Sequence, residues 1–177
     1  MLRMLLLLLF VLTSSCSSKE KAPAQPVPVT TSPTRSSEST AAARDEIIGQ
    51  TIYVPVYSHI YMRDKSRMIN LTATLSIRNT DAQNAIRISA VRYYDTHGAL
   101  LREYINEPLT LTAMASTEFV VAEDDTSGGA GANFIVEWGA GSEVTQPVVE
   151  AVMISTASQQ GISFVSAGRV IKDRAKR

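Results

Sequence analysis

Apolar and polar residues alternate along much of the chain, and the alternation is strictest over residues 70–79. Because successive side chains of a strand point to opposite faces, this period of two predicts an antiparallel strand with one buried and one solvated face. The predicted buried face carries Leu71, Ala73, Leu75 and Ile77.

A strand is also predicted over residues 51–57, where Ile52, Val54 and Val56 share one face. Pro55 interrupts this pattern, because its nitrogen has no hydrogen to donate to a neighbouring strand. The sequence therefore predicts that this strand lies at the edge of a sheet.

The third predicted strand changes phase, since Ile86 and Ile88 have one parity while Val91 and Tyr93 have the other. An extra residue in a bulge at Ser89–Ala90 would return all four side chains to a common buried face.

Further short strands follow, separated by turn residues such as those at 95–98. Eight or nine short strands without an amphipathic helix predict an immunoglobulin-like antiparallel β-sandwich over residues 47–171, with a small β-barrel as the second choice. The further strands are expected at residues 100–105, 109–111, 117–122, 134–138, 148–154, 162–165 and 169–171.

Residues 1–15 have the pattern of a secretory signal peptide: Arg3, an apolar run over 4–12, and small polar residues after it. The single cysteine, Cys16, follows directly and resembles the acylated residue of the bacterial lipobox. The match departs from the usual pattern in that Leu12 stands four residues before the cysteine. We expect a lipid anchor on Cys16; the alternative is an ordinary cleaved signal that leaves a free thiol.

Residues 16–46 are rich in Ser, Thr, Pro, Ala and Lys and have few large apolar side chains, which predicts a disordered linker between lipid and domain. A short basic tail is expected at residues 172–177. The 17 basic and 17 acidic residues give a net charge of zero, which argues against a nucleic-acid partner.

Four blocks of the sequence stand out: GQTIYVPVYSHIY (49–61), NLTATLSIRNTD (70–81), ASTEFVVAEDDTSGGAGANFIVEW (115–138) and EAVMISTASQQGISFVSAGRVI (150–171). These blocks resemble the DUF3124 family of uncharacterised bacterial exported proteins. The resemblance spans about residues 49–171 and implies an envelope protein of unknown activity, without carrying over any catalytic residue.

An acidic, glycine-rich segment at 123–133 contains the candidate ligand-binding residues Asp124, Asp125, Ser127 and Asn133. Oxygen ligands beside a pliable backbone suit Ca²⁺, but the spacing fits no EF-hand loop. It also lacks the paired carboxylates of an aspartic protease and the lysine of a phosphate-binding loop. The simplest interpretation is a long connection between strands, and a functional loop would contact a ligand or partner rather than catalyse.

Tyr53, Tyr57, His59 and Tyr61 alternate with the predicted core residues of the first strand. Aromatic rings with polar tips are typical of protein interfaces and sugar-binding surfaces, so these four residues are candidate binding residues. In the alternative arrangement they pack the second face of the sandwich beneath a loop at residues 63–67.

The expected function is a non-enzymatic binding or structural module, lipid-anchored on the outer-membrane or periplasmic side of the bacterial envelope. An envelope protein or a glycan is the expected partner. No cofactor or metal is expected, since zinc takes three or four nitrogen or sulfur ligands and His59 and His97 are the only histidines. The alternative is a metal-dependent or hydrolytic enzyme that combines the loop at 123–133 with one histidine.

Overall fold

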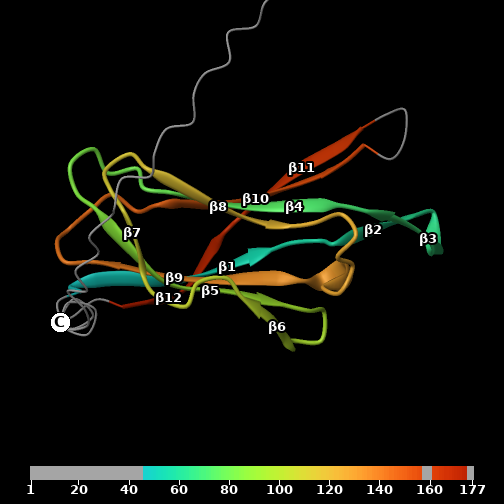
Figure 1. The fold of residues 1–177 in the computed structure, drawn as a ribbon, viewed down its shortest axis with the longest axis horizontal. Helices are drawn as coiled ribbons and strands as arrows, with labels where there is room; N and C mark the ends of the chain where they lie inside the picture. The colour runs from blue at the N-terminus through green and yellow to red at the C-terminus, as the bar shows by residue number, and fades with distance from the viewer. Residues whose placement is uncertain (1–45, 157–160, 175–177) are drawn as a thin grey trace, which may run out of the picture. The chain divides into compact units, whose positions relative to one another are not determined.

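The computed structural model describes residues 46–156 and 161–174. They form an antiparallel β-sandwich, as predicted, with twelve strands rather than eight or nine and one 3-10 turn, η1 (Gly129–Gly131) (Figure 1). The strands are β1 (Ile48–Pro55), β2 (His59–Met62), β3 (Asp64–Asn70), β4 (Thr72–Arg78), β5 (Ile86–Tyr94), β6 (Leu100–Glu103), β7 (Leu109–Leu111), β8 (Ser116–Val121), β9 (Asn133–Ala140), β10 (Val148–Ser155), β11 (Ile162–Ala167) and β12 (Arg169–Asp173).

Two sheets form the layers of the sandwich. The six-stranded sheet has the order β12-β1-β9-β5-β6, and β7 pairs with β5 beside β6. The four-stranded sheet has the order β11-β10-β4-β8. The remaining strands, β2 and β3, form a separate two-stranded hairpin. No helix of the described residues is long and apolar enough to span a membrane.

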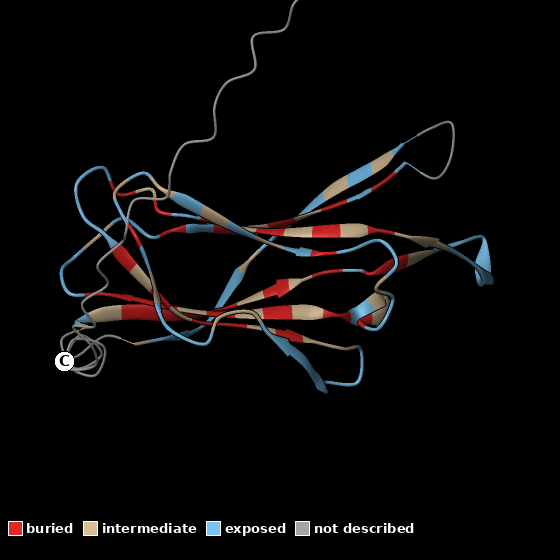
Figure 2. Cartoon of the chain, viewed as in Figure 1, coloured by how far each residue is buried: buried red, intermediate tan, exposed pale blue. Residues whose placement is uncertain are grey.

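The core lies between the inner faces of the two sheets, where buried residues recur at every second position (Figure 2). In β4 the side chains of Ala73, Leu75 and Ile77 are buried and those between them are partly exposed, which confirms the alternation predicted from the sequence. The largest fully buried side chains of the opposite sheet are Trp138, Tyr93 and Phe134.

The prediction that the strand containing Pro55 lies at an edge is wrong, because β1 pairs with β9 on one side and β12 on the other. Val56 donates to the Ala132 carbonyl on the β9 side, and alternate residues of a strand donate to opposite sides. The Pro55 nitrogen therefore faces the β12 side. The last pair of the β1–β12 ladder is Tyr53–Arg169, so no strand stands opposite the missing hydrogen.

The phase change in the third predicted strand is a bulge, as expected. The register of β5 against β9 shifts between Ile88 and Ala90, and both Val91 and Tyr93 are buried after it. The bulge lies between the part of β5 that pairs with β7 (Ile86–Ile88) and the part that pairs with β6 (Arg92–Tyr94).

One side of the sandwich is closed by a segment that changes sheets. β11 pairs with β10 in one sheet, and β12 pairs with β1 in the other. The crossing occurs at Gly168, where a Cβ atom would lie 2.7 Å from both Ile52 Cγ2 and the Val149 carbonyl oxygen. Only glycine fits this approach without displacing its neighbours.

The opposite side is joined by Tyr104, which follows β6. Its hydroxyl donates to the Val120 carbonyl of β8 (3.2 Å), and its ring packs edge-on against Phe119 (5.4 Å). A residue of the six-stranded side thereby contacts the edge strand of the four-stranded sheet.

A buried polar network secures the end of the sandwich at which β4 ends. The Asn79 amide donates to the carbonyls of Asn84, Leu111 and Thr112 at 2.8–3.2 Å. The Asp81 carboxylate accepts backbone hydrogen bonds, including one from Thr145 (2.9 Å). Asn79 and Asp81 therefore link the connection that follows β4 to the connections that follow β7 and β9.

Candidate functional site

The hairpin β2–β3 projects from the sandwich at the end opposite the start of β1 (Figure 1). It was expected as a loop at residues 63–67, but it is a pair of antiparallel strands. The Leu71 N–H donates to the Ser58 carbonyl (3.0 Å) at its base. The chain reverses at Arg63, which has a φ of 69°, in the left-handed region.

Strand register decides which hairpin side chains share a face. Tyr61 pairs directly with Met68, and Ile60 pairs with Ile69. Directly paired residues point to the same side, so Tyr61 and Met68 lie on one face and the two isoleucines on the other. Beyond this pair the register shifts and Met62 pairs with Asp64, so residues 65–67 bulge out of the ladder with no paired residue in β2.

Only the base of the hairpin is buried. Ile60 and Ile69 pack against the core, whereas every residue from Tyr61 to Met68 is exposed (Figure 2). The side chains of Tyr61, Met62 and Met68 have exposed fractions of 46%, 42% and 57%. Three large apolar residues therefore gather in solvent on a short projecting element.

The charge of this hairpin is positive. Residues 59–70 contain Arg63, Lys65 and Arg67 against a single carboxylate, Asp64. The Asp64 carboxylate accepts from the Ser66 hydroxyl and the Ser66 N–H, and these hydrogen bonds lower its pKa. Among the described residues no carboxylate forms an ion pair with the three cations.

The four aromatic residues predicted as a stripe do not form one surface. Tyr53 lies within β1 on the outer face of the six-stranded sheet, partly exposed. The Tyr57 ring contacts Phe164 of the other sheet at 5.9 Å. His59 is buried at the base of the hairpin, and its ring lies edge-on to Tyr61 at 5.3 Å. The structure thus brings together only His59 and Tyr61.

The acidic, glycine-rich segment is occupied by contacts within the fold. Ser127 donates its hydroxyl to Asp125 (2.5 Å), which also forms an ion pair with Arg102 (3.0 Å). These interactions, with that of Ser127 first, lower the pKa of Asp125. Asp124 is exposed, and Asn133 is the first residue of β9, paired with Pro55.

The backbone of the same segment is bound by two hydroxyl groups from distant strand ends. Ser58 contacts the Thr126 and Gly129 carbonyls and accepts from the Gly129 N–H (2.7 Å). Thr96 donates to the Gly128 carbonyl and accepts from the Gly131 N–H, both at 2.9 Å. Backbone groups of this segment that could otherwise bind a ligand are therefore already hydrogen-bonded to Ser58 and Thr96.

Tyr93 packs beneath the segment. A Cβ atom on Gly128 would lie 1.9 Å from the Tyr93 hydroxyl, so glycine is required for this close approach. Burial raises the pKa of Tyr93 to about 12. This hydroxyl is consequently neutral over the physiological pH range.

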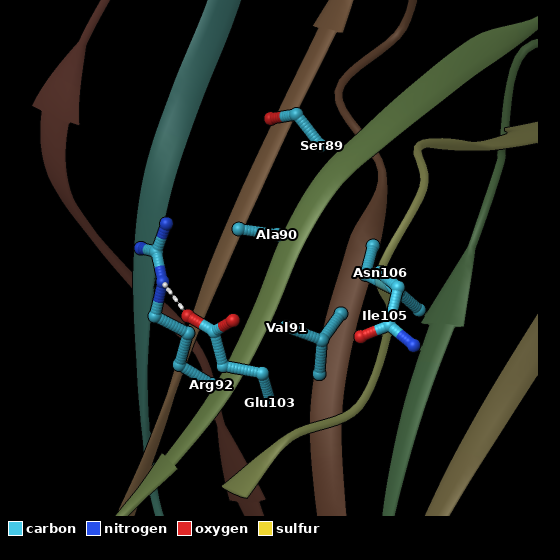
Figure 3. A pocket seen from close by; sticks show the side chains of 7 residues that line it. All are labelled: Ser89, Ala90, Val91, Arg92, Glu103, Ile105 and Asn106. Atoms are coloured by element: carbon cyan, nitrogen blue, oxygen red, sulfur yellow. Dashed lines mark hydrogen bonds and ion pairs between the residues drawn. The ribbon is translucent and has the colours of Figure 1, made fainter. Parts of the chain in front are cut away.

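A small hollow of about 230 Å³ lies at the bulge of β5 (Figure 3). Ser89, Asn106 and the Arg92–Glu103 ion pair (3.3 Å) contribute its polar atoms. The Arg92 guanidinium also binds Glu137 at 2.8 Å, and Glu137 binds Arg174. Burial alone would raise the pKa of Glu137, but the two arginines lower it. Charge is balanced within this group.

No hydrogen bond joins either histidine ring to a carboxylate among the described residues, although the backbone N–H of His97 donates to Asp95 (2.8 Å). The two ring nitrogens of His59 have no hydrogen-bond partner among the described residues, and His97 lies exposed in the turn after β5. The described part of the chain contains no group of three or more His, Cys, Asp or Glu side chains that could hold a metal ion.

Several predictions concern segments outside the described residues. They are the signal peptide at 1–15, the acylated Cys16, and nearly all of the linker at 16–46. The basic tail is described only in part: β12 continues to Asp173, and Arg174 binds Thr51 (3.3 Å) and Glu137.

Sequence reasoning missed Met62, Arg63 and Met68. The signal in the sequence for a hairpin was that Ile60 and Ile69 stand on either side of a mostly polar run that contains the turn. It is weak, because a strand with both faces in solvent shows no alternation of buried and exposed residues.

Comparison with protein families gives one match: the family described as a protein of unknown function (DUF3124) matches residues 49–171. This range begins in β1, includes the projecting hairpin and ends in β12. Neither the curated proteins nor the solved structures contain a significant match to the chain. The match covers more than half of the chain, and the protein belongs to the DUF3124 family.

Proposed function

We propose that this protein is a lipid-anchored binding module of the bacterial cell envelope, and that the hairpin β2–β3 is its contact surface. The observation that carries the proposal is the exposure of Tyr61, Met62 and Met68 on an element that projects from the sandwich. Apolar and aromatic side chains gathered in solvent mark interaction sites, whereas scattered ones are ordinary.

The placement of the hairpin supports this function. The linker enters the domain just before Ile48, and the hairpin lies at the other end of the described unit (Figure 1). The point at which the chain enters the domain therefore lies away from the hairpin. Anchoring through Cys16, on the outer-membrane or periplasmic side, would hold that surface within the envelope.

The contacts of the acidic segment favour binding over catalysis. A catalytic carboxylate and histidine must converge within hydrogen-bond reach. Asp125 instead binds Arg102 and Ser127, and the ring of His59 packs on Tyr61. The proposed module therefore acts through its surface.

Site-specific photocrosslinking in living cells tests the proposal. A diazirine amino acid replaces Tyr61 in one chain and Met114 in another, and adducts of any class, protein, glycan or lipid, are identified by mass spectrometry. Met114 is the matched control, because it is 69% exposed and lies near the other end of β4. Adducts from position 61 alone are expected. Equal adducts from both positions, or none from position 61, would overturn the proposal.

A further inference from the structure

We propose that the partner of the β2–β3 hairpin is a lipid surface with anionic headgroups, into which Met62, Met68 and Tyr61 insert while Arg63, Lys65 and Arg67 contact phosphates. This inference rests on the proposed function and specifies its partner. It concerns the membrane surface only, without a span across the bilayer.

Charge is the first argument. The chain as a whole is neutral, yet the exposed part of the hairpin concentrates three cations around one carboxylate. That carboxylate is already bound by Ser66, whereas no ion pair among the described residues involves the cations. Basic side chains free to approach a surface are attracted to anionic lipids within a Debye length.

The arrangement of apolar residues is the second argument. Tyr61 and Met68 form a directly paired, exposed couple on one face of the hairpin, and Lys65 and Arg67 lie close to Met68 in the exposed, unpaired stretch of β3. Tyrosine is enriched where a ring sits at the boundary of hydrocarbon and headgroup, and long basic side chains extend from that boundary toward phosphate. The hairpin thus carries both kinds of side chain that an interfacial element uses.

The shape of the element distinguishes lipid from a protein partner. A two-stranded hairpin that projects from the sandwich is convex, and a protein would need a matching cavity to bury its tip. A fluid lipid interface closes around a convex apolar wedge without such a cavity. Neither the hollow at the β5 bulge nor a second hollow, of about 260 Å³ beside Ile86, is lined by hairpin residues.

Vesicle flotation tests the inference with the full chain carrying Cys16→Ser, so that acylation cannot cause the association. The vesicles consist of phosphatidylcholine alone or of phosphatidylcholine with about one-third phosphatidylglycerol. The charge variant is Arg63→Gln, Lys65→Gln, Arg67→Gln in the same chain. Its N-terminal segment is unchanged, so a difference in flotation belongs to the hairpin. Melting curves check that the variant is folded.

With about a fivefold contribution from each cation, partitioning to the anionic vesicles is expected to fall by about 100-fold in the charge variant. Met62→Ser, Met68→Ser should weaken binding to both vesicle types, and high salt should weaken only the anionic preference. Equal binding of the charge variant and the parent chain would overturn the inference.

The two proposals fail separately. No flotation of the parent chain, together with protein or glycan adducts from position 61 in cells, would overturn the lipid inference and leave the binding module standing. No flotation and no adducts would overturn both.

Discussion

At the scale of single residues, the fold depends on a few close approaches and on buried hydrogen bonds that cross between connections. Gly168, Gly128 and Asn79 hold positions where another side chain would meet backbone atoms, meet a buried ring, or leave carbonyls without donors. These residues determine how strands and connections of the two sheets are held together.

Replacing Gly168 by alanine should lower the free energy of unfolding by about 1–3 kcal/mol, the usual cost of overpacking. The added Cβ would lie 2.7 Å from Ile52 Cγ2 and from the Val149 carbonyl oxygen. Urea denaturation measures the change. Gly161→Ala is the control, because its Cβ would meet only the Ser155 carbonyl oxygen at 3.7 Å. Equal stability of the two variants would contradict this close approach.

The Asp81 carboxylate should make stability depend on pH. Hydrogen bonds from the backbone of Thr145, Gln83 and Asn84 lower the pKa of Asp81 from 3.8 to about 2. The lowered pKa stabilises the folded state above pH 3.8, and this contribution is lost as the pH falls toward about 2. The difference in melting temperature between the parent chain and Asp81→Asn should therefore shrink over that interval.

Asp124→Asn provides the control, because the Asp124 side chain is exposed and accepts no hydrogen bond among the described residues. Asp124→Asn should melt in parallel with the parent chain at every pH. A constant difference between Asp81→Asn and the parent from neutral pH to pH 2 would contradict the assigned hydrogen bonds.

At the scale of elements, the sequence predicted those strands whose two faces meet different environments. β4 alternates because one face is core and the other solvent, and the phase change at Ser89–Ala90 marked a bulge for the same reason. In β2 and β3, His59 is buried and Ile60 and Ile69 pack against the core, whereas residues 61–68 are all exposed. These strands therefore lack the alternation of buried and exposed residues that the sequence could reveal. Pairing of β12 with β1 joins residues far apart in sequence, which is why Pro55 gave a wrong edge prediction.

The hairpin should be dispensable for stability, since its strands pair only with each other. The Leu71 N–H donates to the Ser58 carbonyl, and hydrogen-bonded pairs recur at every second position of an antiparallel ladder. Ile60 and Ile69 are therefore the next hydrogen-bonded pair, and a two-residue Asn-Gly turn can connect them. Replacing residues 61–68 by Asn-Gly should change the free energy of unfolding by less than about 1 kcal/mol. Thermal and urea unfolding measure this change.

The matched comparison for that replacement is Ile60→Ala, which removes an apolar side chain packed against the core. It should destabilise more than loss of the whole exposed tip. The reverse order would mean that the tip contributes to the folding of the sandwich, and would weaken its assignment as a contact surface.

At the scale of the whole molecule, the many short strands with alternating apolar residues were enough to predict the two-layer architecture. They were not enough to predict the order of the strands within each sheet. β9 pairs with β1 and β5, and β10 pairs with β4 and β11, so most neighbours in the sheets are distant in sequence. Such pairings are selected by the packing of the finished core, which local patterns do not contain. The candidate site was predictable only as far as Tyr61; its basic and methionine residues became evident from their exposure.

Anchoring of the protein through acyl chains should depend on the thiol group of Cys16. Cys16→Ser should abolish incorporation of labelled palmitate and move the protein from the membrane fraction toward the soluble fraction, because two acyl chains give stable anchoring. Immunoblotting of fractions and labelling of living cells measure this. Retained label in Cys16→Ser would show that acylation occurs elsewhere, or that Cys16 has another role.

The most direct test of the contact surface is methionine oxidation, measured on the unaltered protein in intact envelopes and on the purified Cys16→Ser chain free of lipid and detergent. Met62, Met68 and Met114 are all exposed in the structure, at 42%, 57% and 69%. If the hairpin is the contact surface, oxidation of Met62 and Met68 will be several-fold slower in envelopes, while Met114 will react at the same rate in both. Unchanged rates at Met62 and Met68, or equal slowing of all three, would contradict the account.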